Sequence, residues 1–364
     1  MKAIDLFAGC GGMSAGFIEN GFDIKLAVEI NGEIAQSYKN NHIGTEVIVD
    51  DINNIDDKVL RNFRDTDVII GGPPCQGFSM AGSRIREGFI DDPRNYLFKG
   101  YFNVVQKIKP KYFVMENVPG LLTMQNGAVF NEIKRIFSDD VLLDGDKYYV
   151  HHNIFKAEEM GIPQKRERLV IIGALNKEYN FEETYDLAKK GILNRNDRFF
   201  DKVNVRDAIG DIPEPTKSGK VILNDISSDY QSSLRTKDGV TTNHLKTNHS
   251  KKAVERMSKI KPGENYKVLD EVIKSVHSGS YGRMERDKPS VTITTRFDTP
   301  AGGRYIHPED NRTITPREAA RIQSFPDKFD FTGSKTSICT QIGNAVPPKL
   351  AYFLSEFIKT IDEN

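Results

Sequence analysis

One cysteine of this chain lies in a setting that could make it a nucleophile. The segment Gly71 to Ser79 reads GGPPCQGFS and follows a short apolar run, so Cys75 comes just after a predicted strand. Pro73 and Pro74 restrict the backbone immediately before the thiol. A free cysteine is more often a small buried apolar residue than a nucleophile. This rigid, polar setting nevertheless favours a thiol that is directed at a ligand.

A glycine-rich turn near the N-terminus could bind a nucleotide-like cofactor. The segment Asp5 to Gly12 reads DLFAGCGG, and such turns let the backbone approach a ligand where a helix N-terminus points. Ser14 stands where a dinucleotide fingerprint requires glycine, which disfavours pyrophosphate recognition. Glu29, 20 residues after Gly9, could accept hydrogen bonds from a ribose. A methionine-bearing adenosine therefore fits better than NAD, and an ordinary glycine-rich turn is the alternative.

Two other strand ends carry carboxylates. Asp51 and Ile52 follow a predicted strand and offer a polar and an apolar side chain to an adenine. Glu116 lies in the segment MENVPG, at the end of the apolar run Tyr112 to Met115. A buried carboxyl among apolar neighbours tends toward a raised pKa and can stay protonated as an acid. The sequence thus predicts that Glu116 is a proton donor, and a solvated glutamate at a strand end is the alternative.

Two later segments could complete the site. In Gln164 to Arg168, which reads QKRER, Arg166 and Arg168 are two residues apart, and on an extended chain both point to the same face. They could enter one site, or they could form a charged strand edge. The segment Gln341 to Pro348 reads QIGNAVPP and predicts a tight turn before the last helix, with Asn344 as a turn residue.

The elements that would position these residues alternate along the first 175 residues. Apolar runs predict strands at Ala3 to Phe7, Ile24 to Glu29, Glu46 to Asp50, Asp67 to Gly71, Tyr112 to Met115, Tyr148 to Ile154 and Leu169 to Gly173. Helices are expected at Met13 to Asn20, Gly32 to Asn40, Leu97 to Ile108 and Phe130 to Phe137. This alternation predicts an α/β fold with a mostly parallel sheet covered by helices. Ligands of such sheets bind at the carboxyl ends of the strands.

Beyond Asn176 the sequence becomes polar and rich in turns, which predicts a second, smaller, irregular domain. We expect a catalytic and cofactor-binding domain at 1–175 and 335–364, and a small domain at 176–334.

Three elements are signalled in the later part of the chain. Ser290 to Thr294 alternates in polarity like a strand. Thr315 and Glu318 form a capping box that predicts a helix through Ser324. A last amphipathic helix is expected over Pro348 to Ile361, where it should pack on the first domain.

Charge is balanced overall but not locally. The chain carries 51 basic and 51 acidic residues, so its net charge makes no overall case for nucleic acid. From Gln231 to Lys261, eight lysines and arginines face two acids, a local net of +6. This run includes Lys251, Lys252 and Lys259. Such runs are usually a solvated face, and phosphate binding is the competing interpretation.

The composition also indicates in which cellular compartment the protein works and whether it binds a metal. Three scattered cysteines argue against a disulfide framework and for a reducing compartment, with Cys10 and Cys339 expected to be structural. No apolar run approaches the ~18 residues of a membrane span, and no signal segment precedes the first strand. We therefore expect a soluble, cytoplasmic protein. The seven histidines show no zinc-binding spacing, so no metal is expected.

Six segments together resemble the DNA (cytosine-5)-methyltransferase family, over essentially the whole chain and in the family's order. They are Asp5 to Gly12, Pro73 to Ser79, Glu116 to Val118, Gln164 to Arg168, Arg317 to Pro326 and Gln341 to Pro348. The resemblance implies a Rossmann-like S-adenosylmethionine-dependent methyltransferase sheet and a target-recognition region at about 176–288. The compact chain resembles the bacterial restriction-modification type, which methylates a specific sequence of double-stranded DNA.

The resemblance also implies roles for individual residues. Cys75 would be the nucleophile, and Glu116, Arg168 and Arg166 would be the other catalytic residues. S-adenosylmethionine would be held by Phe7, Ala8, Gly9, Cys10, Gly11, Gly12, Glu29, Ile30, Asp51, Ile52, Pro74, Leu97, Asn344 and Ala345. DNA would be contacted by Gln76, Ser79, Lys251, Lys252, Lys259 and Thr292.

The chemistry of cytosine agrees with this catalytic set. Carbon 5 is a poor nucleophile, but addition of a thiolate at carbon 6 turns the ring into an enamine that attacks a methyl sulfonium. Glu116 would donate to ring N3, and Arg168 would hold the carbonyl oxygen with Arg166 nearby. Because neither face of a stacked base is open, the cytosine must be flipped out of the duplex.

Three alternatives stay open at this point. An RNA (cytosine-5)-methyltransferase of the same fold would carry the same catalytic segments, but more than a hundred residues between Gly173 and Val291 favour a recognition domain for DNA. An inactive duplex-binding regulator would lack the thiol or the acid. A nicotinamide dehydrogenase would need glycine in place of Ser14. We expect a monomer whose partners are double-stranded DNA and a cognate restriction endonuclease acting on the same site.

Overall fold

The computed structural model describes residues 1–74, 96–271, 273 and 278–364 and divides the chain into two compact units. The first unit comprises Met1–Lys156, Glu167–Phe199 and Leu350–Asn364, and the second comprises Ala157–Arg166 and Phe200–Lys349. Three residues of the expected site, Cys75, Gln76 and Ser79, lie outside the described residues. None of the helices in the described ranges has the length and apolar character that crossing a membrane requires.

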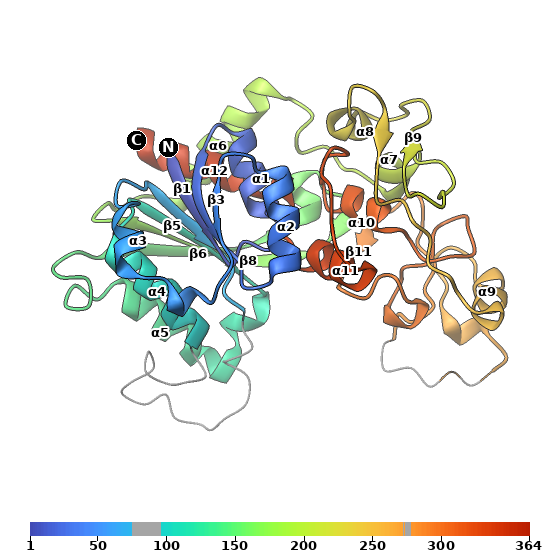
Figure 1. Ribbon diagram of the computed structural model, residues 1–364, viewed down its shortest axis with the longest axis horizontal. Coiled ribbons are helices and arrows are strands. Elements are labelled where there is room, and N and C mark those ends of the chain that lie inside the picture. Colours follow the sequence, from blue (N-terminus) through green and yellow to red (C-terminus); the bar gives the residue numbers. More distant parts are fainter. Residues whose placement is uncertain (75–95, 272, 274–277) are drawn as a thin grey trace. The chain divides into compact units, whose positions relative to one another are not determined.

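A seven-stranded sheet in the order β3-β2-β1-β4-β5-β8-β6 forms the centre of the first unit (Figure 1). Its strands are β1 (Lys2–Leu6), β2 (Asp23–Val28), β3 (Glu46–Ile48), β4 (Val68–Gly71), β5 (Tyr112–Asn117), β6 (Tyr148–Lys156) and β8 (Glu167–Leu175). The first five are parallel, whereas β8 is antiparallel to both β5 and β6. The expected α/β fold with a mostly parallel sheet is confirmed.

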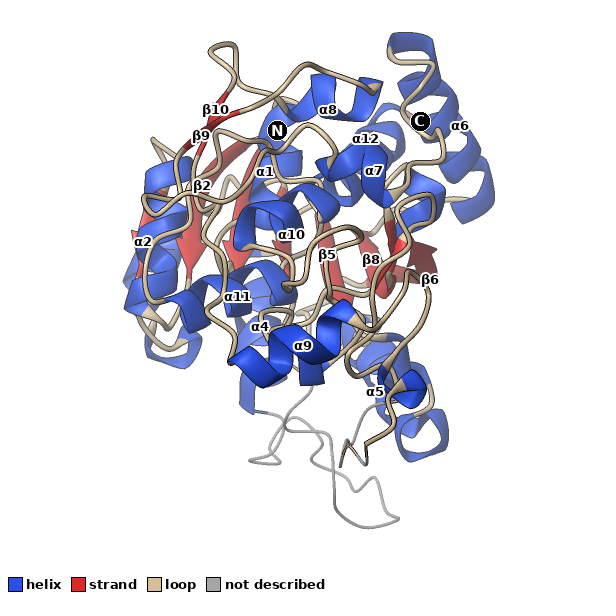
Figure 2. Cartoon of the chain, turned by 90° about the vertical axis from the view of Figure 1, so that its right-hand side faces the viewer, coloured by secondary structure: helices blue, strands red, loops and turns tan. Residues whose placement is uncertain are grey.

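Helices cover both faces of this sheet (Figures 1 and 2). They are α1 (Gly12–Glu19), α2 (Gly32–Asn41), α3 (Asp57–Arg61), α4 (Tyr96–Ile108), α5 (Ala128–Phe137), α6 (Phe181–Arg195) and α12 (Pro348–Glu363). On one face, Leu6 and Phe113 pack with Tyr101 and Phe137 of α4 and α5 in a single buried cluster. Parallel strands are usually buried on both faces, which is why these strands read as continuous apolar runs in the sequence.

Helix α6 was not expected from the sequence, and it moves part of the chain into the first unit. Its Phe181 packs on Phe357 of α12 with ring centroids 4.9 Å apart, and its Arg195 forms a 2.7 Å ion pair with Glu356. The compact units differ from the expected domain boundaries, which placed residues 176–199 in the small domain and residues 157–166 and 335–349 in the catalytic one.

The second unit has little regular structure. Its elements are β7 (Gln164–Lys165), α7 (Val205–Ile209), β9 (Val221–Ile222), α8 (Asp229–Leu234), β10 (Val240–Thr241), α9 (Lys251–Ser258), β11 (Ser290–Val291), α10 (Pro316–Ile322) and α11 (Lys335–Asn344). The expected strand at 290–294 shortens to β11, which pairs in parallel with β7. The predicted capping box is confirmed, because Thr315 Oγ1 accepts from the Glu318 amide while the Glu318 carboxylate accepts from the Thr315 amide.

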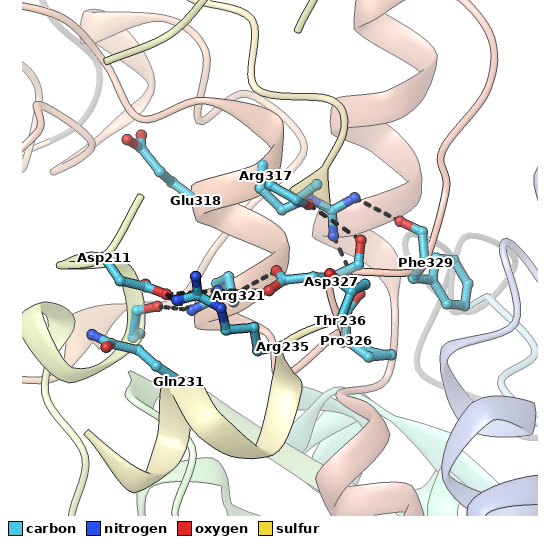
Figure 3. Close-up of polar contacts among 12 residues, drawn as sticks. Asp211, Gln231, Arg235, Thr236, Arg317, Glu318, Arg321, Pro326, Asp327 and Phe329 are labelled. Carbon is cyan, nitrogen blue, oxygen red and sulfur yellow. Dashed lines mark hydrogen bonds and ion pairs between the residues drawn. The ribbon is translucent and has the colours of Figure 1, made fainter. Parts of the chain in front are cut away.

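Buried arginines of α10 hold this irregular unit together (Figure 3). Arg321, fully buried, pairs with Asp327 at 2.5 Å and with Asp211 at 3.1 Å. Arg317 donates to the carbonyls of Phe329 at 2.6 Å and Thr242 at 2.9 Å. Segments that are more than a hundred residues apart in the chain, such as Asp211 and Arg321, are thereby fastened to one short helix.

Candidate active site

The strand order places two of the expected motifs side by side in the first unit. β1 lies between β2 and β4, so the connections that leave β1 and β4 diverge, and such a point in a parallel sheet is where ligands bind. Leu6 pairs with Gly71 at the carboxyl ends of the two strands. A side chain at Gly71 would meet the Leu6 carbonyl oxygen at 2.3 Å, so only glycine fits there. The glycine-rich turn and the Gly72-Pro73-Pro74 segment therefore start from adjacent positions.

The glycine-rich turn adopts backbone conformations that favour glycine. Gly9 has φ +57° and Gly11 has φ +93°, and Phe7 is also in the left-handed region at φ 59°. A Cβ at Gly11 would come within 2.1 Å of the His42 ring, whereas nothing lies within 4 Å of a Cβ at Gly9. Backbone at Gly9 is therefore open on the side where a ligand would approach.

Glu29 is the polar anchor of this turn. Its Oε2 accepts from the Gly9 amide at 2.9 Å, and its Oε1 accepts from the Asn31 amide at 2.9 Å. Burial raises the pKa of Glu29, and the two backbone hydrogen bonds lower it in part. Each carboxylate oxygen keeps a second lone pair, so Glu29 can still accept hydrogen bonds from the hydroxyls of a ribose.

The remaining expected cofactor residues fall into two groups. In the first unit, Ile30 is 66% exposed beside Glu29, and the Asp51 side chain accepts from the Asn53 amide at 2.9 Å. Ala8, Cys10, Gly12 and Ile52 are buried, Leu97 is half-buried in the first turn of α4, and Pro74 is exposed. Burial raises the pKa of the Cys10 thiol to about 12, so it stays protonated and inert. Asn344 and Ala345 belong to the second unit.

Glu116 is paired with an arginine. Its Oε1 lies 2.6 Å from Nε of Arg168, and both side chains are largely buried, with 12% and 14% of their surface exposed. β5 and β8 bring the two together, because their antiparallel register pairs Glu116 with Val170. The sequence suggested apolar surroundings for this carboxyl, and that expectation is wrong: a guanidinium faces it.

Asn117 was included in a motif but was given no role from the sequence. Its Nδ2 donates to the carbonyl oxygen of Pro73 at 3.0 Å, and its Oδ1 accepts from the Val118 amide at 2.8 Å. The side chain thus holds the backbone two residues before Cys75. Its signal in the sequence is an amide directly after a candidate acid at a strand end.

Arg166 and Arg168 have different partners. Arg166 is buried and donates to the backbone carbonyls of Ile293, Gly343 and Ala345 at 2.9 to 3.1 Å, all within the second unit. The expectation that the two point the same way assumed an extended chain. Instead, the Arg166 amide donates to the Gln164 carbonyl at 2.9 Å, and the chain turns between β7 and β8.

The expected tight turn at Gln341 to Pro348 is also corrected. Gln341 to Asn344 form the last turn of helix α11, which begins after the N-cap Ser334. Gly343 is required here, because a Cβ would lie 2.5 Å from the backbone of Thr294.

Two lysines of the basic run, in and just after helix α9, form ion pairs with glutamates. Lys252 lies 3.3 Å from Glu271, and Lys259 lies 2.9 Å from Glu255, while Lys251 is exposed. These pairs are exposed, and exposed pairs are worth little and exchange easily. The phosphate-binding role of the run stays a prediction.

A second basic surface of the same unit was not predicted from the sequence, although one of its residues, Thr292, was among the expected DNA contacts. It is a pocket of about 910 Å³, which we call the threonine groove, lined among others by Lys165, Thr292, Thr294, Arg296 and Arg304. Lys165 and Arg296 are exposed there, and Thr292 Oγ1 donates to the Lys165 carbonyl at 2.7 Å. Arg304 donates to the backbone carbonyls of Glu264 and Arg283. Its guanidinium therefore forms part of the wall of the groove and is not available to bind a phosphate.

The chain is similar to known proteins along almost its whole length. The family model for C-5 cytosine-specific DNA methylase matches residues 1–360. The chain belongs to this family. It is 37% identical to the Type II methyltransferase M1.HphI of Haemophilus parahaemolyticus, covering 99% of this chain and 87% of that protein. It is 35% identical to the Type II methyltransferase M.DdeI of Desulfomicrobium norvegicum, covering 100% of this chain and 90% of that one.

Solved structures show the same fold. A crystal structure of a prophage-encoded DNA modification methyltransferase from Escherichia coli matches with a TM-score of 0.77 and 27% identity, over the whole of both chains. The Dnmt2 methyltransferase of S. pombe matches with a TM-score of 0.62 at 18% identity, which shows the fold alone. A C-5 cytosine-specific DNA methylase implies a methyl donor of the S-adenosylmethionine type and DNA as the substrate.

We predict that Asn117→Ala slows methyl transfer about tenfold, because one buried hydrogen bond that positions the Pro73 backbone is lost. Asn117→Asp keeps the acceptor for Val118 but loses the donor to Pro73, and should behave alike. Single-turnover rates and cofactor affinity measured separately check this, with affinity expected to change less than about twofold.

Asn153→Ala is the matched control for this prediction. The Asn153 side chain likewise accepts from the amide of the next residue, Ile154, at 2.8 Å, but within the described part of the chain it donates to no backbone carbonyl as Asn117 does. Equal slowing in the Asn153 and Asn117 variants would contradict a specific role for Asn117.

Proposed function

We propose that this DNA methylase transfers a methyl group to carbon 5 of a flipped-out cytosine in a specific double-stranded sequence, through a covalent bond from Cys75 to carbon 6. The observation that carries the proposal is the Glu116–Arg168 pair beside the backbone that leads to Cys75. A Cβ at Gly72 would lie 3.0 Å from Glu116 Oε2, so the carboxyl is in contact with that backbone.

The residues around the glycine-rich turn fit S-adenosylmethionine. Open space at Gly9, the buried acceptor Glu29 and the exposed apolar Ile30 suit an adenosine with its ribose. When bound, this cofactor supplies a methyl group on a sulfonium centre.

The pairing of Glu116 with Arg168 suits the edge of cytosine. Ring N3 and the carbonyl oxygen are adjacent atoms of that edge, so the two side chains that bind them must themselves be neighbours, as these are. Arg168 donates to the carbonyl oxygen. Glu116, which pairs with Arg168 as a carboxylate in the free chain, takes up a proton when the base binds and holds it at N3. Together they stabilise the charge that arrives on the ring when the thiolate adds.

The covalent step balances with these residues. The Cys75 thiolate forms a bond to carbon 6, and the electron pair of the C5–C6 double bond becomes available at carbon 5. Carbon 5 would then take the methyl group from the sulfonium, and the electron pair of the broken S–C bond would stay on the sulfur, which leaves as a neutral thioether. Loss of the carbon 5 proton to a base restores the double bond and expels the thiolate.

We predict that Cys75→Ser abolishes methylation while cofactor affinity is retained, because the thiol adds to the base and not to the adenosine. Bisulfite sequencing of DNA from cells that express the wild type or Cys75→Ser measures activity and target sequence together. Transfer by the serine variant above about a hundredth of the wild-type rate would refute the nucleophile.

A duplex that carries 5-fluorocytosine tests the covalent bond directly. Fluorine cannot leave as a proton, so the wild type should remain attached through Cys75 and Cys75→Ser should not. The same assay with a single-stranded RNA of equal sequence separates the DNA and RNA substrates. An adduct on RNA alone would overturn the DNA assignment.

We predict that Glu116→Gln loses at least about a hundredfold in rate while it still binds target DNA, because glutamine keeps a donor but cannot deliver a proton. Glu167→Gln, an exposed neighbour on the same strand as Arg168, is the control and should be silent. If Glu116→Gln loses DNA affinity but transfers normally at saturation, Glu116 only positions the base.

We also propose that the threonine groove holds DNA phosphates, because Lys165 and Arg296 are exposed beside threonine hydroxyls. Replacing both by alanine should lower the salt slope of binding by about 0.9 for Lys165 and by less than that for Arg296, which already lies 3.8 Å from Asp298, on target and scrambled duplexes alike. The backbone bond from Thr292 to Lys165 is unaffected by that change.

The triple variant of Lys251, Lys252 and Lys259 provides the comparison. We expect it to lower the slope by less than about 0.9 per residue, because two of the three lysines already face carboxylates. An unchanged slope in the Lys165 and Arg296 double variant would place the phosphates elsewhere.

The relatives suggest a biological setting. Both M1.HphI and M.DdeI are Type II methyltransferases. We propose that this chain likewise protects its target sequence from a restriction endonuclease that cleaves the same site.

A further inference from the structure

A buried carboxyl of the central sheet has no part in the proposed chemistry. Asp5 stands in β1 between Ile4 and Leu6 and is only 1% exposed. Its Oδ2 accepts from Ser14 Oγ at 2.6 Å, and Ser14 Oγ lies 2.7 Å from Tyr38 Oη. Ser14 and Tyr38 are themselves fully buried. We call these three residues the Asp5 chain.

The Asp5 chain closes the glycine-rich turn. Asp5 comes just before the turn and Ser14 just after it, in the first residues of α1, so their hydrogen bond joins the two ends of residues 6–13. Tyr38 extends the connection to α2. It also lies 2.9 Å from where a Cβ at Gly11 would be, so it contacts the turn itself.

Asp5 has no cationic partner within the described part of the chain. The titratable groups that act on it or feel its charge are Glu29 after β2, Cys10 in the turn, Tyr38 of α2 and Tyr101 of α4. Burial raises the pKa of Asp5 to about 7, and the neighbouring Glu29 charge adds to this, while Ser14 opposes it. The group therefore changes charge within the range in which the enzyme would work.

We propose that Asp5 and Ser14 are positioning residues, which set the conformation of the turn and thereby the affinity for the methyl donor. The inference rests on the proposed binding of S-adenosylmethionine at this turn. Left-handed φ at Phe7 is costly for a residue with a side chain, and the bridge from Asp5 to Ser14 holds that conformation in place.

The charge of Asp5 sets the strength of this bridge. When Asp5 is ionised, Ser14 donates to a carboxylate and Tyr38 donates to Ser14, and charge-assisted hydrogen bonds are the stronger kind. When Asp5 is protonated, that assistance is lost. Affinity for the methyl donor should therefore rise about threefold to tenfold as pH rises from 6 to 8.

Folding stability should respond in the opposite sense. The folded pKa of Asp5 lies above its ordinary value, so the folded chain binds this proton more tightly than the unfolded chain does. The stability from that proton is present at low pH and is lost as pH rises through about 7. Asp5→Asn removes the titrating group and should flatten that part of the stability profile.

Calorimetric titration with S-adenosylmethionine and with S-adenosylhomocysteine, from pH 6 to 8, tests the proposal. Ser14→Ala should weaken both ligands by about five to ten times at pH 8, because it removes the bridge. Asp5→Asn should abolish the pH dependence of affinity that the wild type shows. Ser138→Ala, which removes a hydroxyl bond to the Tyr148 carbonyl elsewhere in the first unit, is the matched control and should change neither ligand.

Each outcome decides a different point. Wild-type affinity and pH dependence in both Asp5→Asn and Ser14→Ala would overturn the positioning role. Weakening of the cationic sulfonium ligand alone would also overturn it, since Asp5 would then act on the ligand charge and not through the turn. If the wild type binds neither ligand, the proposed function fails and the positioning role falls with it. A flattened stability profile in Asp5→Asn, read from thermal unfolding, shows independently that Asp5 titrates in the fold.

Discussion

Strand β1 lies between β2 and β4, which are both parallel to it, and the position of the proposed site depends on that arrangement. The chain leaves β1 toward β2 but leaves β4 toward β5, on the other side. The turn that follows β1 and the segment that follows β4 therefore diverge at the carboxyl edge, which is where ligands of parallel sheets bind. Gly71 permits the close approach of the two strands, because any side chain would meet the Leu6 carbonyl. The glycine-rich turn, the backbone before Cys75 and the Glu116 carboxyl therefore share one edge of one sheet.

The second unit is held together by side chains more than by β-sheet. Its chain forms few strand pairs, so its buried backbone carbonyls must accept hydrogen bonds from other donors. Buried arginines supply them: Arg283 donates to the carbonyls of Met257, Ile260, His307 and Asp310, while Arg166 and Arg317 serve others. One guanidinium offers five N–H donors in a fixed plane, so a few such residues can hold many loops. A largely irregular unit can thus be held together with little regular secondary structure.

Local signals in the sequence were enough for most of the fold. Strands of a parallel sheet are apolar throughout, and the capping box of α10 is a four-residue pattern, so both were predicted. Helix α11 was missed because its serine, threonine and glycine residues have weak helix propensity. The Glu116–Arg168 pair could not be predicted, since it depends on the register of β5 against β8 and not on either segment.

The spacing of the two arginines in the QKRER segment was not enough to predict the role of each one. They are two positions apart, yet Arg168 faces the candidate acid and Arg166 donates to three backbone carbonyls. Lysine could not replace Arg166, because its single ammonium lacks the planar fork that reaches Ile293, Gly343 and Ala345 together. Loss of activity at Arg166 would therefore follow from a disordered second unit, and would not by itself assign the residue to the reaction. The two side chains differ because the chain turns at Arg166, whose amide donates to the Gln164 carbonyl. This turn interrupts the extended backbone that would have directed both arginines to the same face.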